Sequence, residues 1–105
     1  MTLDEAIEHA TGYHCTTTFV KDFDFAEHFG LDAVKDTYER AFAEWKTNTK
    51  YLTELVLVLN WKIWQWYERN DDLARLYDKL WREADCWAGE NLKGKDAEYY
   101  FRTLD

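Results

Sequence analysis

The chain has 105 residues, of which 47% are apolar and 18% aromatic, and its formal net charge at pH 7 is −8. This length suits a single domain with its own hydrophobic core, and the aromatic content excludes an intrinsically disordered chain. The negative charge repels phosphate backbones, so we expect no direct binding of nucleic acid. No apolar run reaches the roughly 20 residues that cross a bilayer, and the amino terminus lacks the features of a signal peptide, so we expect neither membrane insertion nor secretion.

The first part of the chain predicts one short helix followed by an irregular stretch. Thr2 and Glu5 have the spacing of a capping box, which predicts a helix from Leu3 to Thr11. Residues 15 to 20 contain three consecutive threonines and have the composition of a strand, but an isolated strand has no partner. We therefore favour a loop or irregular helix over residues 13 to 24. The segment after Asp24 predicts one or two further helical turns.

A longer amphipathic helix is predicted from residue 32 to about residue 47. Asp32 is a suitable N-cap, and the apolar residues that follow recur at helical spacing on one face. The opposite face carries acidic and basic residues. This pattern is typical of a surface helix with one buried stripe, formed by Leu31, Val34, Tyr38, Ala41, Phe42 and Trp45.

Residues 49 to 69 are the most apolar segment, and they predict the central helix of the fold. Its end is expected near Asn70, a residue that tolerates the left-handed conformation. A helical wheel leaves a narrow strip for water, made of Val58, Lys62, Gln65 and Arg69. The other positions form a broad apolar stripe, made of Leu52, Leu55, Val56, Leu59, Ile63, Trp66 and Tyr67, and a second, narrower patch, made of Leu57, Trp61 and Trp64.

The next helix is predicted over residues 72 to 89, with Asp71 as its N-cap. Almost no linker separates it from the central helix, so the two should form an antiparallel hairpin. A short last helix, about residues 96 to 102, should return Tyr99, Tyr100 and Phe101 to the bundle. The predicted fold is thus all-α, a single domain over 1-105 with four to five helices around the Trp-rich segment. Glycine is expected where helices end, at Gly12, Gly30, Gly89 and Gly94.

Histidine and cysteine residues give weak support for a metal site or an enzyme. Cys15 and Cys86 lie far apart, which is typical of thiols in a reducing compartment, and we expect a cytoplasmic protein without a disulfide. Zinc ligands converge at short, regular spacings, which these residues lack, so we expect no metal, no cofactor and no catalytic residue. A small metal protein or enzyme that uses His14, Cys15 and His28 is kept as an alternative; His9 would be the fourth ligand.

The patch that contains Trp61 and Trp64 has two interpretations. The amino-terminal helices of the same chain could cover it as part of the core. Alternatively, both indoles stay partly exposed and anchor a partner or a second copy, because Trp is enriched at interface hot spots. A structural helical homodimer that buries Trp61 and Trp64 is therefore an alternative function.

The negative charge is concentrated in the first half of the chain. Residues 1 to 45 carry ten acidic and three basic side chains, a net charge of −7, whereas residues 46 to 105 carry eleven acidic and ten basic ones, a net charge of −1. We expect a non-enzymatic protein-binding module whose acidic face occupies a basic surface on another protein, as an inhibitor that mimics nucleic acid. The residues assigned to this face are Asp4, Glu5, Glu8, Asp22, Asp24, Glu27, Asp32 and Asp36.

Two runs of the sequence, LVLVLNWKIWQWYERNDDLARLYDKLW and ENLKGKDAEYYFRTLD, carry a resemblance to other proteins in their general texture. They resemble the short acidic proteins carried by bacterial phages and conjugative elements, among which anti-CRISPR and anti-restriction inhibitors are found. The resemblance implies an anti-defence role and assigns no function to individual residues.

Overall fold

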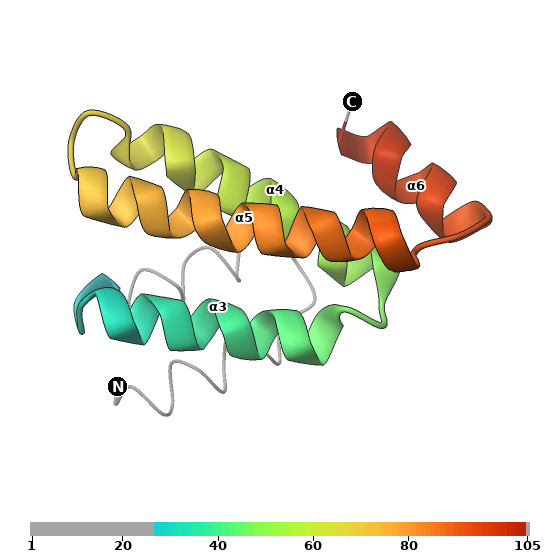
Figure 1. Cartoon of the computed structure of the whole chain (residues 1–105), viewed down its shortest axis with the longest axis horizontal. Helices are drawn as coiled ribbons and strands as arrows, with labels where there is room; N and C mark the ends of the chain where they lie inside the picture. The colour runs from blue at the N-terminus through green and yellow to red at the C-terminus, as the bar shows by residue number, and fades with distance from the viewer. Residues whose placement is uncertain (1–26, 105) are drawn as a thin grey trace.

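A computed structural model describes residues 27 to 104, which are mostly helical (Figure 1). The helices are α3 (Leu31–Trp45), α4 (Thr49–Trp66), α5 (Asp71–Asn91) and α6 (Lys95–Leu104). The described part of the chain contains no strand, and the predicted all-α class is confirmed. The helix predicted from Leu3 to Thr11 and the irregular segment 13 to 24 lie outside the described residues.

Helices α4 and α5 form the predicted antiparallel hairpin (Figure 1). α3 lies along one side of this hairpin, and α6 lies at the end where α4 begins and α5 ends. α4 ends at Trp66 and not near Asn70 as predicted, so the turn to α5 begins earlier in the sequence. Glu68, with a φ of 63°, supplies the left-handed residue that we expected at Asn70.

The helix starts show which polar residues act as caps. Asn48 caps α4, since its side-chain oxygen accepts a hydrogen bond from the backbone N–H of Tyr51 at 3.3 Å. Asn70 caps α5 by accepting from the N–H of Leu73 at 3.2 Å, so the predicted cap at Asp71 was wrong by one residue. The predicted cap at Asp32 was also wrong, because the N-cap of α3 is Gly30.

Two glycines differ in what they do for the helices. Gly30, with a φ of 101°, is the residue before α3, a conformation that an L-residue at this position would adopt only with strain. Asp32 lies in the first turn of α3, where the positive end of the helix dipole stabilises its carboxylate. Gly89 does not end α5, contrary to the prediction. The buried Ala88 keeps the last turns packed, and α5 continues to Asn91.

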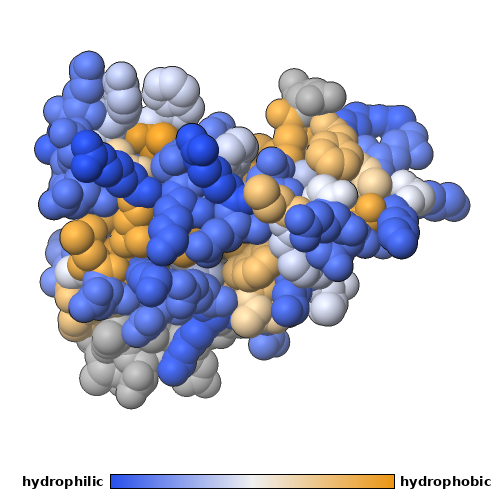
Figure 2. Space-filling view, in the orientation of Figure 1, coloured by the Kyte–Doolittle hydropathy of each residue, from blue (hydrophilic) through white to orange (hydrophobic). Residues whose placement is uncertain are grey.

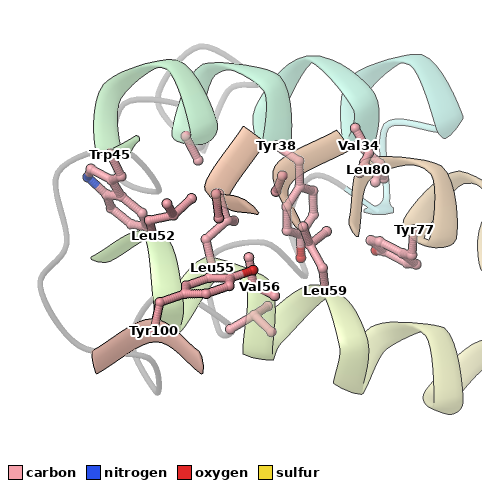
Figure 3. Packing of buried hydrophobic residues seen from close by; sticks show 14 of the residues in the cluster. Val34, Tyr38, Trp45, Leu52, Leu55, Val56, Leu59, Tyr77, Leu80 and Tyr100 are labelled. Atoms are coloured by element: carbon pink, nitrogen blue, oxygen red, sulfur yellow. The ribbon is translucent and has the colours of Figure 1, made fainter. Parts of the chain in front are cut away.

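The core lies between α3, α4 and α5 and contains aromatic as well as aliphatic side chains (Figure 3). The rings of Tyr38 on α3 and Tyr77 on α5 meet edge to face, with centroids 5.5 Å apart. This contact joins α3 to the hairpin. The fully buried members of the core are Val34, Tyr38, Ala41, Leu52, Leu55, Val56, Val58, Leu59, Tyr77, Ala88 and Tyr100.

α6 is attached to the hairpin through Tyr100. Its ring is fully buried, and its hydroxyl donates a hydrogen bond to Oδ1 of Asp85 at 2.7 Å. Burial, with the hydrogen bond and negative charge of Asp85, raises the pKa of Tyr100. The prediction that three aromatic residues of α6 return to the bundle holds for this one only, because Tyr99 and Phe101 stay about half exposed.

Candidate interaction surface on α4

The two sides of α4 differ from the predicted pattern. Val58 and Lys62, which we expected to face water, are completely or almost completely buried. Trp61 and Trp64, by contrast, are 53% and 67% exposed. Both indoles are thus exposed to solvent, and their role as anchors for a partner stays a prediction. The predicted polar strip was wrong at Val58 and Lys62.

A buried ion pair explains why Lys62 leaves the solvent. Its ammonium donates a hydrogen bond to Oε1 of Glu27 at 2.7 Å, and the hydroxyl of Tyr77 donates to the same oxygen at 2.5 Å. The Lys62 ammonium also lies 5.7 Å from the ring centroid of Trp61. The positive charge of Lys62 and the negative charge of Glu27 are thus buried as a pair, and two donors hold the carboxylate in place.

The ion pair also changes the assignment of Glu27. The sequence placed this residue on an outward acidic face, but its side chain is only 14% exposed and its charge is matched by Lys62. Glu27 therefore belongs to the interior polar contact of α4 and α5. A signal was present in the sequence, since a lysine inside an apolar helix has to snorkel to solvent or find a buried carboxylate.

The exposed side of α4 and its C-cap residue carry large apolar side chains, which we call the α4 aromatic row. Its members follow each other at spacings of three or four residues, so neighbours lie on one helix face. The rings of Trp64 and Tyr67 are in contact, with centroids 5.8 Å apart. No member is charged. The row consists of Leu57, Trp61, Trp64 and Tyr67, which are 36%, 53%, 67% and 56% exposed.

The α4 aromatic row has about the area of the largest apolar patch on a typical monomeric protein. With about 200 Å² for each fully exposed large side chain, its exposed fractions leave on the order of 400 Å² in water. Patches of this area on monomeric proteins are often functional. The row is thus a candidate binding surface.

Other exposed apolar side chains in the described part do not form a comparable row. Phe29 and Leu31 lie at the start of α3, and Tyr99 and Phe101 are two residues apart, so they point to different sides of α6. The face of the molecule seen in Figure 2 is mainly hydrophilic, with smaller apolar areas between α4 and α5, at the seam between α3 and α5 and on α6.

The predicted acidic face is only partly within the described residues. Asp32 and Asp36 are exposed on α3, where Lys35 pairs with Glu39 at 3.7 Å. Residues 27 to 104 carry fifteen acidic and twelve basic side chains, a net charge of −3 out of the total of −8. The other five negative charges belong to residues 1 to 26 and 105. Outside the described residues lie Asp4, Glu5, Glu8, Asp22 and Asp24.

The described residues give no support to the alternative of a metal site. Within residues 27 to 104 no group of three or more His, Cys, Asp or Glu side chains is arranged to hold a metal ion. Cys86 is an exposed free thiol on α5. The other candidate ligands, His9, His14 and Cys15, lie outside the described residues.

A shallow groove lies where α4 ends and α5 begins. Ile63 and Ala74 form its apolar floor, next to Tyr67 of the α4 aromatic row. Its charged residues are mixed: Arg75 stands between Asp71 and Asp78, and the Asp78 carboxylate accepts a hydrogen bond from Arg82 at 2.8 Å. The groove therefore has no single charge that would select a ligand.

Comparisons with known proteins leave the surface to be interpreted from its own geometry. No family model, no curated protein and no solved structure matches the chain. Among residues 27 to 104, no helix combines the length and the apolarity that crossing a membrane requires. The α4 aromatic row and the charge distribution are thus the features from which a function can be argued.

Proposed function

We propose that this chain is a non-enzymatic protein-binding module. The observation that supports the proposal is the α4 aromatic row, in which the indoles of Trp61 and Trp64 are at least half exposed on one face of a packed helix. Exposed apolar area is costly in water, at about 25 cal/mol per Å², and a protein contact recovers that free energy. Trp and Tyr are also the residues most enriched at interface hot spots.

The charge of the chain favours a partner with a basic surface. A net charge of −8 speeds the encounter with a cationic protein and slows the encounter with an anionic one. Asp32 and Asp36 on α3 are available for such a contact, whereas Glu27 is engaged with Lys62. An inhibitor of the anti-CRISPR or anti-restriction type, in which carboxylates replace the phosphates of a nucleic acid, is the form of this function that the resemblance to phage and conjugative-element proteins favours.

The experiment that tests the proposal is affinity capture from a bacterial lysate with the immobilised full chain. We expect wild type to retain one or a few basic proteins, and to retain less as salt screens the charges. The double variant Trp61→Ala/Trp64→Ala should retain much less. The variant Tyr99→Ala/Phe101→Ala, which removes similar exposed area from α6, is the matched control and should behave as wild type. Equal retention by all three proteins would contradict the proposal.

The captured protein then allows a direct test of mimicry. If the chain replaces a nucleic acid, a short DNA or RNA duplex should compete with it for the purified partner. The variant Asp32→Asn/Asp36→Asn should compete less well than wild type, because it removes two exposed negative charges. Simultaneous binding of duplex and chain would rule out the nucleic-acid mimic and leave the binding module.

A further inference from the structure

We infer that Lys62 is a positioning residue of the α4 aromatic row, because its buried ammonium group fixes the orientation of the exposed Trp61 indole. Glu27 pairs with this ammonium group, and Tyr77 holds the Glu27 carboxylate. The inference rests on the proposed role of the row as a binding surface and deepens it, since it assigns a part in binding to polar groups that lie beneath the row.

Trp61 and Lys62 are in contact although they are consecutive residues of α4. Nζ of Lys62 lies 5.7 Å from the centroid of the Trp61 ring, within the range of a cation–π interaction. Consecutive residues of a helix project about 100° apart, so this contact requires the indole to lean toward the side on which Lys62 is buried. The Lys62 side chain is completely buried, and a desolvated cation attracts an aromatic ring more strongly than an exposed one does.

The ammonium group of Lys62 is itself held in place. It donates to Oε1 of Glu27 at 2.7 Å, and the Tyr77 hydroxyl donates to the same oxygen. The ring of Tyr77 is fully buried and meets the ring of Tyr38 edge to face. Moving the ammonium group away from this carboxylate would break a buried ion pair, which is costly. A series of contacts thus connects the core to the indole of Trp61 at the surface.

Each exposed indole of the row therefore has a neighbour that restricts its motion. The ring of Trp64 packs against Tyr67 with centroids 5.8 Å apart, and the ring of Trp61 has the ammonium group of Lys62. Association loses free energy for every side chain that it has to order, and a side chain that is already ordered reduces this loss. Releasing the Trp61 indole should thus weaken binding even though the row keeps all its apolar side chains.

Fluorine NMR of the full chain, with all six tryptophans fluorinated, tests this positioning. The signals of Trp61 and Trp64 are identified by their loss in the Trp→Phe variants. We expect Glu27→Leu/Lys62→Met to move the Trp61 signal toward that of free fluorotryptophan, because the charge beside the ring is gone and the indole samples several rotamers. The Trp64 signal should stay close to its wild-type position. Tyr100→Phe is the matched control, because it breaks a buried hydrogen bond at the opposite end of the hairpin and should leave the Trp61 signal unchanged.

The second measurement is the affinity for the basic protein that the immobilised full chain captures. Glu27→Leu/Lys62→Met should bind this protein about twofold to tenfold more weakly than wild type, which corresponds to ordering one additional side chain on association. Tyr100→Phe should bind it as wild type does. If the double variant fails to fold by circular dichroism, Tyr77→Phe replaces it in both measurements and should change them in the same direction, since it removes only the hydroxyl that holds Glu27.

A Trp61 signal that is unchanged in the variant of the ion pair overturns the inference, and so does a signal that moves without any loss of affinity. An equal change in Tyr100→Phe also overturns it, because the effect would then reflect a general loss of stability. If binding of the captured protein depends on Trp61 but not on Lys62, the inference fails while the proposed function stands. If the full chain captures no protein, the proposed function fails, and the fluorine signal alone decides whether Lys62 positions Trp61.

Discussion

Trp61 and Lys62 are neighbours on α4, yet the indole is 53% exposed and the lysine side chain is completely buried. The comparison of these two sides shows that the environment, not the hydropathy of the residue, decides which side of a helix faces inward. Lys62 finds a carboxylate and becomes an interior residue, whereas the α4 aromatic row finds no cover from the described helices. The row is therefore the surface where a partner can contribute free energy.

The largest effect is expected for Glu27→Ala, which breaks the buried ion pair between Glu27 and Lys62. The substitution removes the carboxylate that pairs with a completely buried ammonium, so we expect the free energy of unfolding to fall by about 3 kcal/mol. Urea denaturation monitored by circular dichroism measures the change. The control is Glu39→Ala, which removes an exposed pair with Lys35 and should change stability by about 0.5 kcal/mol or less. Equal effects of the two substitutions would show that the buried pair has no special role.

A double variant sharpens the same point. In Glu27→Leu/Lys62→Met the two charges leave together, so the double variant should be more stable than Glu27→Ala alone. If the double variant is as unstable as the single one, the loss comes from packing and not from the removal of one charge of the pair.

A smaller effect is expected for Tyr77→Phe, which keeps the ring contact with Tyr38 and removes only the hydroxyl that donates to Glu27. Hydrogen bonds to charged groups contribute about 2 kcal/mol, and we expect a loss of this size in the same denaturation experiment. In a Glu27→Ala background the effect of Tyr77→Phe should shrink, since the acceptor is gone. An unchanged effect in that background would show that the Tyr77 hydroxyl does not stabilise the fold through Glu27.

Tyr100→Phe tests a second hydrogen bond from a phenol to a carboxylate, which joins α6 to α5. The substitution removes the bond to Asp85 and should cost about 1.5 kcal/mol at neutral pH, the lower end for a bond to a charged group, because Asp85 is partly exposed. Because the folded-state pKa of Tyr100 is raised above the value of about 10 in the unfolded chain, wild type loses this stability as the pH rises above about 10. Denaturation as a function of pH should show a shallower decline for Tyr100→Phe. Tyr99→Phe, on the exposed side of α6, is the control and should follow wild type.

The smallest effect on stability is expected on the exposed side of α4. Trp64 is 67% exposed, so Trp64→Gln should change the free energy of unfolding by no more than about 0.5 kcal/mol, measured at a concentration where wild type is monomeric. A loss as large as that of Glu27→Ala would mean that the indole stabilises the single chain, and the contrast between the two sides would disappear.

Much of the fold was predictable because it depends on local patterns. Helical periodicity predicted helices over residues 32 to 47, 49 to 69, 72 to 89 and 96 to 102, which correspond to the four described helices within a few residues at each end. The short linker after α4 predicted the hairpin. Caps were harder, because Asn70, Asp71 and Asp72 all have side chains that can cap a helix. Only the observed hydrogen bond to the N–H of Leu73 selects Asn70.

The candidate site was predictable only in part. Trp61 and Trp64 stood out as a second apolar patch of the central segment, but a helical wheel gives the angle of a side chain and not what lies against it. Lys62 was misplaced for the same reason. Its partner Glu27 is thirty-five residues away in the sequence, and no local pattern connects the two.

The sequence by itself determined that this chain is helical, that its middle segment is the core helix and that its negative charge is concentrated at one end, because periodicity and charge are properties of neighbouring residues. The tertiary structure alone decided which side of that helix is interior. A lysine became a core residue because a distant carboxylate and a tyrosine hydroxyl meet it there, and two tryptophans stayed at the surface because no described helix packs over them. Burial depends on contacts between segments far apart in the chain, and these exist only once it has folded.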